Sequence, residues 1–201
     1  MELALFLAGS FLIGSIPFGY LIAKAKGVDI RGTGSGNIGA TNVWRTLGAG
    51  PGLLAFFLDM AKGAVPAYFG GEMLGVGPYA VLCGLAAVLG HVFSPWLGFK
   101  GGKGIATGLG LLIGSDPVIA SLSLMCFLLG MIFTRIVSLS SLIATALMMT
   151  LSISLGRDPV VIAVMWLMGI VIFKKHWPNI QRLRQGTEPQ FQFKRKQEKA
   201  P

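Results

Sequence analysis

Glycines alternate with hydrogen-bond donors over residues 32–42, GTGSGNIGATN, and an arginine follows at position 45. Glycines allow backbone N–H groups to turn toward an anion and to approach it closely. The hydroxyls and amides of the stretch are neutral donors, and a guanidinium can bind a phosphate through two hydrogen bonds at once. The stretch therefore predicts an anion-binding loop. Its candidate residues are Gly34, Ser35, Gly36, Asn37, Gly39, Thr41, Asn42 and Arg45.

The same residues contain the spacing G-x-G-x-x-G, which can mark a dinucleotide-binding turn. That fingerprint follows a β-strand and opens the helix of a βαβ unit. Here the apolar run 3–22 precedes the glycines, and Asp59, at the distance of a ribose ligand, falls inside another apolar run. We therefore expect no nucleotide site. We expect Asp59 to form a buried ion pair with Lys62, one helical turn later.

A second loop with the same chemistry, GFKGGKGIATG, covers residues 98–108. It combines two lysines with glycines directly before an expected helix, whose N-terminus adds free N–H groups and partial positive charge. It is not a Walker A loop, because Gly104 follows Lys103 where a serine or threonine would bind Mg²⁺. Two such loops predict two phosphate-bearing ligands. The candidate residues of the second loop are Lys100, Gly101, Gly102, Lys103, Gly104 and Thr107.

A third polar segment, KKHWPNIQRLRQGTEP, covers residues 174–189, directly after the last apolar run. His176 and Asn179 are three residues apart and would share a face if this turn is helical. Pro178 favours a helix that begins near residue 177 over one that continues through the segment. His176 is a candidate base for an attacking hydroxyl, and the alternative is an interfacial residue beside Trp177.

The elements that must position these segments are membrane helices. Of the 201 residues, 53% are hydrophobic and 12% are charged, and a soluble chain of this length could not bury so much apolar surface. We expect an all-α integral membrane protein with seven transmembrane helices, a single domain over residues 1–201 with a basic tail from about 174. The short, glycine-rich fourth run should be shielded from lipid. The apolar runs are 3–22, 52–70, 75–92, 103–114, 117–133, 138–155 and 159–173.

Basic residues lie in alternate connections between the apolar runs. The connections on the other side hold Arg157 as their only base. The positive-inside rule therefore predicts that the basic loops and the C-terminus are cytoplasmic and the N-terminus is outside. The same distribution accounts for the net charge of +9 without a nucleic-acid partner. The bases on the predicted cytoplasmic side are Lys24, Lys26, Arg31, Arg45, Lys100, Lys103, Arg135, Lys174, Lys175, Arg182, Arg184, Lys194, Arg195, Lys196 and Lys199.

Four ordered segments resemble the bacterial acyl-phosphate:glycerol-3-phosphate acyltransferase family: GSGNIGATNVWRTLG, GHVFSPWLGFKGGKGIATGLG, TRIVSLSS and HWPNIQRLRQGTEP. The resemblance extends from about residue 14 to 189. It implies a multi-pass enzyme of the bacterial inner membrane with its active site at the cytoplasmic face. Such an enzyme moves a fatty acyl group from acyl phosphate to the 1-position of glycerol 3-phosphate, giving lysophosphatidic acid and phosphate in phospholipid biosynthesis.

The resemblance also implies roles for single residues. The glycines around the second lysine of GFKGGKG would line a phosphate site, Ser141 is a further candidate for substrate binding, and Glu188 would be mainly structural. The sequence departs from the family pattern at HWPN, where we expect a basic or polar pair between His and Asn. The residues with expected catalytic roles are Ser35, Arg45, Lys103, His176 and Asn179.

The chemistry of an acyl phosphate agrees with these residue types. Its leaving group is a stable anion, so the enzyme mainly has to hold two anionic substrates in position. The proton of the attacking hydroxyl could pass to His176 or to the substrate's phosphate, whose second pKa is about 6. We expect no metal, no cofactor, no nucleic acid and no required protein partner. The expected partners are glycerol 3-phosphate, acyl phosphate and membrane lipids.

Two further classes of function compete with the acyltransferase. An organic-phosphate transporter is the alternative, because short glycine-broken spans can mark a transport site. A nucleotide-dependent phosphotransferase would need clustered carboxylates for magnesium, which the predicted cytoplasmic loops lack.

The sequence also indicates which acyl donor the protein uses. Many thioester-using acyltransferases carry a His and an Asp separated by four residues. Here Trp96 stands five positions after His91 and Gln181 five after His176, so acyl phosphate is the expected donor.

Overall fold

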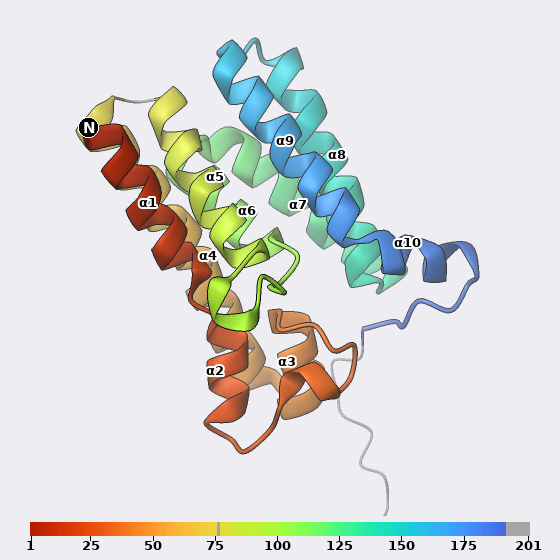
Figure 1. Ribbon diagram of the computed structural model, residues 1–201. Coiled ribbons are helices and arrows are strands. Elements are labelled where there is room, and N and C mark those ends of the chain that lie inside the picture. Colours follow the sequence, from red (N-terminus) through yellow and green to blue (C-terminus); the bar gives the residue numbers. More distant parts are fainter. Residues whose placement is uncertain (76, 192–201) are drawn as a thin grey trace, which may run out of the picture.

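The computed structural model describes residues 1–75 and 77–191, and this part of the chain consists of helices joined by loops (Figure 1). The predicted tail bases Lys194, Arg195, Lys196 and Lys199 lie outside the described residues. The short 3₁₀ helices are η1 (Ile30–Gly32) and η2 (Pro95–Leu97). The α-helices are α1 (Glu2–Ser15), α2 (Phe18–Lys24), α3 (Ala40–Leu47), α4 (Ala49–Leu74), α5 (Pro78–Val92), α6 (Ile105–Ser115), α7 (Pro117–Thr134), α8 (Val137–Ser154), α9 (Pro159–Lys175) and α10 (Trp177–Arg184).

Each predicted apolar run coincides with one helix, except that the first is divided between α1 and α2. Within the described residues, five segments are long and apolar enough to cross a membrane, and α9 with α10 is a sixth if this pair, bent by 58°, is counted together. Helix α6 has only 11 residues. An all-helical, multi-pass membrane protein is thus confirmed. The five segments are Glu2–Lys24, Ala49–Leu74, Pro78–Leu97, Pro117–Thr134 and Val137–Ser154.

Glycines bring several helices into backbone contact. A β-carbon at Gly14 of α1 would lie 2.1 Å from the Ala87 carbonyl oxygen of α5, and one at Gly110 of α6 would lie 1.9 Å from the Met60 carbonyl oxygen of α4. Small residues of this kind let helices approach closely in lipid, where dispersion contacts replace the hydrophobic effect. Helix α6 contacts α4, α5 and α7, and of its 11 residues five are buried, five are half-buried and Ile113 is exposed.

The α6–α7 and α8–α9 connections are short and locally capped. Asp116 accepts a hydrogen bond from the Ile119 N–H at 3.1 Å, and Asp158 accepts one from the Val160 N–H at 2.7 Å. Each aspartate precedes a proline, a combination that favours a helix start. Arg157 pairs with Asp116 at 2.7 Å. These side chains are therefore engaged in structural contacts.

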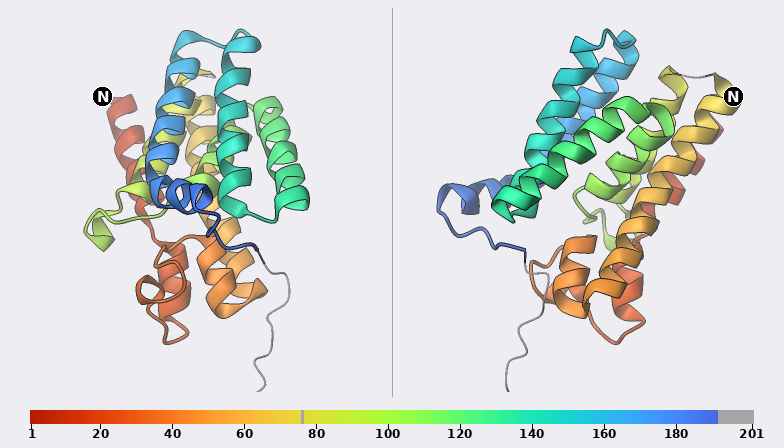
Figure 2. Two further views of the ribbon diagram at one scale, coloured as in Figure 1. Left: turned by 90° about the vertical axis from the view of Figure 1, so that its right-hand side faces the viewer. Right: turned by 180° about the vertical axis from the view of Figure 1, so that it is seen from behind.

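The opposite end holds α2, α3, α10 and the long loops (Figure 1). Helices α8 and α9 lie beside each other on one side of the molecule, and α1 and α4 lie on the other (Figure 2). The larger apolar core includes Val88, Leu111 and Met165, and a smaller core around Ile30 and Val43 joins α2, η1 and α3. The smaller core fixes the first predicted loop against the end of the helix bundle.

Candidate active site

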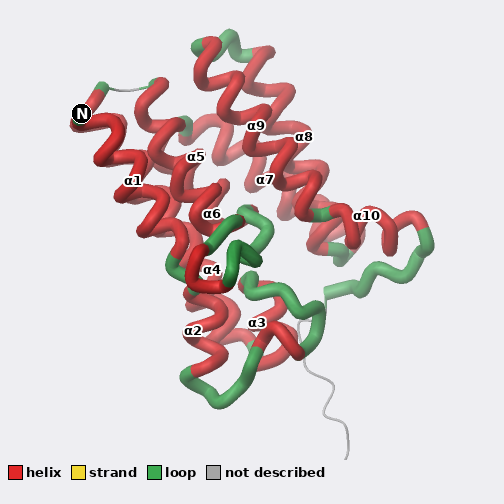
Figure 3. The backbone as a smooth tube through the Cα atoms, in the orientation of Figure 1, coloured by secondary structure: helices red, strands yellow, loops and turns green. Residues whose placement is uncertain are grey.

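The two predicted anion loops and the segment after α9 gather at one end of the molecule (Figure 3). They surround a cavity of about 490 Å³, which we call the polar cavity. It is lined by Gly34, Ser35, Asn37, Gly39, Ala40, Thr41, Asn42, Arg45, Phe56, Asp59, His91, Lys103, Gly104, Ile105, Ala106, Phe127, Val137, Ser138, Ser141, His176, Asn179, Arg182, Glu188 and Pro189.

The polar cavity brings together segments that are far apart in the sequence. All five residues with expected catalytic roles, Ser35, Arg45, Lys103, His176 and Asn179, line it. Most of the expected binding residues do so too. They are Gly34, Asn37, Gly39, Thr41, Asn42, Gly104 and Ser141.

Five expected binding residues lie elsewhere, for reasons that the sequence did not reveal. Gly36 forms a turn at φ 70° within the first loop, and the Lys100 side chain is exposed. The N–H groups of Gly101 and Gly102 donate to the carbonyl oxygens at the end of α5, so they are not free for a phosphate. Thr107 is fully buried, with its backbone against α4. The structure does not bring these five residues to the polar cavity.

Asn42 organises the first loop. Its side-chain oxygen accepts from the Ser35 N–H at 2.9 Å, and its amide nitrogen donates to the carbonyl oxygens of Thr33 at 3.0 Å and Asn37 at 2.8 Å. Because these contacts occupy the amide, Asn42 holds the loop closed over the start of α3. Arg45, one turn further along α3, points into the polar cavity, and no described residue forms a hydrogen bond or an ion pair with it.

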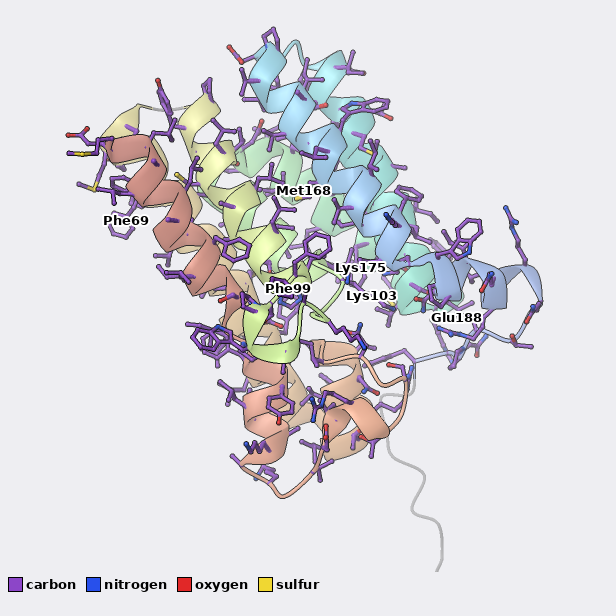
Figure 4. The ribbon with its side chains drawn as sticks, viewed as in Figure 1. Phe69, Phe99, Lys103, Met168, Lys175 and Glu188 are labelled. Atoms are coloured by element: carbon purple, nitrogen blue, oxygen red, sulfur yellow. The ribbon has the colours of Figure 1, made fainter. Side chains whose placement is uncertain are left out.

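A hydrogen-bonded chain connects the second loop to the segment after α9. Lys103 Nζ donates to Asn179 Oδ1 at 2.6 Å, and Asn179 Nδ2 donates to Glu188 Oε1 at 2.5 Å. Glu188 also accepts from Ser138 and Arg182, both at 2.7 Å. Figure 4 labels Lys103 and Glu188, the two ends of this chain. These hydrogen bonds fix the Lys103 ammonium at the cavity wall.

The charged groups of this chain titrate differently from free side chains. Burial, which is partly opposed by the charge of Glu188 and assisted by the smaller effects of Arg182 and Arg45, lowers the pKa of Lys103 to about 8. Burial alone would raise the pKa of Glu188, but the hydrogen bonds from Ser138, Asn179 and Arg182 hold it below its usual value. At neutral pH the cavity therefore contains a fixed carboxylate and a lysine that is charged in most molecules.

His176 lies between α9 and α10 and is 2% exposed. Its Nδ1 is 2.9 Å from the carbonyl oxygen of Ile172, which can only accept, so Nδ1 carries the proton. Burial, and then the charge of Lys103, lower the pKa of His176 to about 4. The ring is therefore neutral at pH 7, and its Nε2 is able to accept a hydrogen bond.

Ser138, Arg182 and Glu188 are polar cavity residues that sequence reasoning did not assign to substrate or catalysis. All three lie in the segments that carry the family resemblance, and Arg182 had been counted only as a topological charge. Nothing in their spacing shows that the start of α8 meets α10 and the segment after it. This contact arises in the tertiary fold, where Glu188 bridges the two.

Replacing Glu188 with alanine is expected to lower the free energy of unfolding by roughly 1–3 kcal/mol, because Ser138, Asn179 and Arg182 lose their common acceptor. Thermal unfolding in detergent measures the change. Glu72→Ala, at the exposed end of α4, is the matched control and should leave the unfolding temperature unchanged. An equal unfolding temperature for both variants would contradict a structural role for Glu188.

A family model described as glycerol-3-phosphate acyltransferase matches residues 4–186 of the chain. The chain belongs to this family. It is 45% identical over 184 residues to the glycerol-3-phosphate acyltransferase of Geobacter sulfurreducens, with 92% of this chain and 95% of that protein aligned. It is 43% identical over 183 residues to the enzyme of the same name from Aquifex aeolicus, with 90% and 95% aligned.

Two solved structures of a relative have the same fold. Both are crystal structures of PlsY (YgiH), an integral membrane glycerol 3-phosphate acyltransferase that is 40% identical to this chain. The glycerol 3-phosphate form has a TM-score of 0.92 and covers 96% of both chains. The lysphosphatidic acid form has a TM-score of 0.89 and covers 96% of this chain and 97% of the other. The glycerol-3-phosphate acyltransferase family thus accounts for the whole fold and assigns the chain to phospholipid biosynthesis.

Proposed function

We propose that this acyltransferase takes its acyl group from acyl phosphate and moves it to the 1-hydroxyl of glycerol 3-phosphate, giving lysophosphatidic acid and phosphate. The observation that carries the proposal is the meeting of Arg45 and Lys103, from separate loops, on one polar cavity that adjoins an apolar one. The forms of PlsY that were solved, with glycerol 3-phosphate and with lysphosphatidic acid, support the acceptor and the product.

The cations of the polar cavity suit two phosphate groups. Arg45 is close enough to Lys103 to help lower its pKa, after the larger effect of burial. Arg45 has no partner among the described residues, and Lys103 donates to a single amide oxygen, so both retain donors for an anion. Charge-assisted hydrogen bonds of this kind hold two repelling substrates side by side. We assign substrate binding to Gly34, Ser35, Asn37, Gly39, Thr41, Arg45, Lys103, Gly104 and Ser141.

The acyl chain needs an apolar site beside the phosphates. A second cavity, the apolar cavity, has a volume of about 90 Å³ and shares Phe56, Ile105, Phe127 and Ser141 with the polar cavity. Ala144 and other side chains of α6, α7, α8 and α9 complete its wall. An acyl chain in this space would place its carbonyl group at the boundary between the two cavities. The boundary is where the hydroxyl of a phosphate-bound glycerol could reach it.

Filling the apolar cavity should shift the preference toward shorter acyl chains. In Ala144→Phe, each methylene that loses its place costs about 0.8 kcal/mol, which lowers kcat/KM about fourfold. Acyl transfer from a series of acyl phosphates of increasing length measures the shift. Ala146→Phe is the control, because Ala146 lies on the exposed side of the same helix. Identical length profiles for the two variants would exclude the apolar cavity as the acyl site.

The proposed reaction forms one bond and breaks one. The 1-hydroxyl oxygen of glycerol 3-phosphate attacks the carbonyl carbon of the acyl phosphate. The bond from that carbon to the bridging oxygen then breaks, and phosphate leaves with the bridging oxygen and its electron pair. Arg45 and Lys103 stabilise the negative charge that develops on the oxygens during this step.

We assign the hydroxyl proton to a substrate phosphate and an orienting role to His176. A general base is most effective when its pKa is near the working pH. The pKa of His176 is lowered to about 4, whereas the second pKa of a phosphate monoester is about 6. Neutral His176 can still accept a hydrogen bond from the hydroxyl through Nε2 and hold it toward the carbonyl carbon.

A comparison of acyl donors tests the proposed function. Purified protein is given glycerol 3-phosphate with either acyl phosphate or acyl-CoA, and lysophosphatidic acid is measured. We expect turnover with acyl phosphate and little with acyl-CoA, because neither His91 nor His176 has an aspartate at the spacing of thioester-using enzymes. Turnover with acyl-CoA alone would refute the proposed donor. Uptake of glycerol 3-phosphate into vesicles without acyl transfer would favour the transporter instead.

We further propose a single domain with seven spans, in which α1 with α2, α4, α5, α6, α7, α8 and α9 each cross the membrane. The N-terminus would be outside the cell, and the polar cavity would open at the cytoplasmic face of the inner membrane. The basic loops between α2 and α3 and between α5 and α6 support this orientation. The contacts of α6 with three neighbouring helices support its crossing in spite of its length.

Single cysteines should label from opposite sides under this topology. In a background with Cys83 and Cys126 replaced by alanine, Glu72→Cys should react with a membrane-impermeant thiol reagent outside the cell. Lys26→Cys should react only in inside-out vesicles. Both positions are exposed at opposite ends of the molecule. Labelling of both from the same side would overturn the seven-span topology.

A further inference from the structure

Three buried ionisable side chains lie at the polar cavity, Asp59 and His91 in its wall and Lys62 beside them, and the proposed reaction does not use them. Asp59 and Lys62 of α4 and His91 of α5 are 2%, 3% and 4% exposed. Asp59 Oδ1 is 2.7 Å from Lys62 Nζ, which confirms the ion pair expected from the sequence, and 3.7 Å from His91 Nδ1. Burying such groups among membrane helices is costly, so their retention calls for a role.

The ion pair is hydrogen-bonded to the backbone between α1 and α2, where the first span is interrupted. Lys62 Nζ donates to the carbonyl oxygen of Ile16, between α1 and α2, at 2.7 Å. Ser94 donates to the Ser15 carbonyl oxygen at 2.6 Å, and Trp96 Nε1 donates to the Ser15 hydroxyl at 2.8 Å. The backbone groups freed by the break are thereby satisfied inside the protein. These contacts fix α4 and the segment that leads into the second loop to the same point.

His91 forms the surface on which the second loop lies. The Gly102 N–H donates to the His91 carbonyl oxygen at 3.1 Å. A β-carbon at Gly102 would lie 2.1 Å from His91 Nε2 and 2.7 Å from Cε1, and the three nearest atoms all belong to the imidazole. Gly102 is not in the left-handed region, so this contact alone requires a glycine there. The next residue is Lys103.

We propose that His91 is a positioning residue for the acyl transfer. Its imidazole lies beside the Asp59–Lys62 ion pair and positions the second loop. The second loop in turn positions the Lys103 ammonium in the polar cavity. The proposal rests on the proposed function of Lys103. It also gives a reason for Gly102 other than phosphate binding: the glycine allows the loop to lie directly against the ring.

A pair of substitutions tests this contact. Gly102→Ala should displace the loop and lower kcat/KM for glycerol 3-phosphate about tenfold or more, because small misplacements of a positioning group are costly. His91→Asn removes Nε2 and Cε1, the atoms that the new β-carbon would meet, and keeps a polar group beside Asp59. The double variant His91→Asn/Gly102→Ala should therefore recover to within about threefold of His91→Asn alone.

Gly101→Ala is the matched control. A β-carbon at Gly101 would lie 1.9 Å from the backbone carbonyl oxygen of His91. This oxygen is present whatever residue occupies position 91. The loss of activity that Gly101→Ala causes should therefore be as large in His91→Asn/Gly101→Ala. A general loosening of the protein by His91→Asn would relieve both alanine variants alike, so recovery at position 102 only identifies the ring as the support.

A second readout connects the contact to Lys103. In a Lys103→Ala background, Gly102→Ala should lower kcat/KM by less than about threefold further, because the displaced ammonium is already absent. Unfolding temperatures in detergent identify variants that fail to fold. If Gly102→Ala itself does not fold, recovery of folded, active protein in the double variant supports the same contact.

Several outcomes would overturn the proposal. The first is a normal kcat/KM in Gly102→Ala. The second is a kcat/KM in His91→Asn/Gly102→Ala that is as low as in Gly102→Ala alone. The third is a full additional loss of kcat/KM when Gly102→Ala is added to the Lys103→Ala background. Each would mean that the ring does not set the place of Lys103. Failure of the proposed function is distinguishable, because the unsubstituted protein would then show no acyl transfer from acyl phosphate.

Discussion

Arg45→Ala is expected to lower kcat/KM for acyl transfer by about 10- to 150-fold. Arg45 lines the polar cavity and has no partner among the described residues, so its guanidinium is free for a substrate phosphate. A charge-assisted hydrogen bond in such a partly sheltered place contributes roughly 1.5–3 kcal/mol. If the contact strengthens in the transition state, its loss appears in kcat/KM. Steady-state kinetics of the purified variant measure the change.

Two further variants separate this role from a general need for positive charge. Arg45→Lys should also be poor, because an ammonium cannot reproduce two parallel hydrogen bonds to a phosphate. Lys26→Ala removes an exposed cation from the same end of the molecule and should change kcat/KM little. If instead Arg45→Ala behaves like Lys26→Ala, the arginine serves only membrane topology, and the first loop is not part of the active site.

Lys103 should give the reaction an alkaline limit. Burial lowers its pKa to about 8, so the ammonium is present at neutral pH and is lost as the pH rises through this value. Because kcat/KM reports ionisations of the free enzyme, it should fall above about pH 8. Lys103→Ala should remove this fall and lower kcat/KM by about 10- to 150-fold at pH 7.

Lys103→Arg is the informative companion variant. A guanidinium stays charged throughout this range, so the alkaline fall should disappear whatever the absolute rate. Rates are corrected for spontaneous hydrolysis of the acyl phosphate at each pH. A fall above pH 8 that is unchanged in Lys103→Arg would assign the limit to another group and contradict the role of the lysine charge.

The sequence predicted those parts of the structure that depend on local pattern. The apolar runs gave every long helix to within a few residues, and the i, i+3 spacing of Asp59 and Lys62 gave their ion pair. Pro178 correctly predicted the start of α10 at Trp177. These features depend on hydropathy, helical periodicity or proline geometry within a few residues, which a sequence displays directly.

The sequence did not show which polar groups are already engaged. Asn42 is a neutral hydrogen-bonding residue like Asn37 or Ser35, yet its side-chain amide is occupied by hydrogen bonds to the backbone of the first loop. Gly102 stands beside Lys103, yet the residue that requires it to be a glycine is the distant His91. Glu188 meets Ser138 only because α8 and the segment after α10 converge. Such assignments depend on tertiary contacts between distant segments, and spacing along the chain does not encode them.

Acyl transfer from an acyl phosphate can be followed through the bridging oxygen of the donor. Purified protein is mixed with glycerol 3-phosphate and an acyl phosphate that carries heavy oxygen in the bridge, and the products are analysed by mass spectrometry. We expect all of the label to appear in inorganic phosphate, with an equal amount of lysophosphatidic acid, because the bond from the bridging oxygen to the carbonyl carbon breaks. Label retained in a free fatty acid, with the phosphate moved to the acceptor, would show phosphoryl transfer and contradict acyl transfer by this protein.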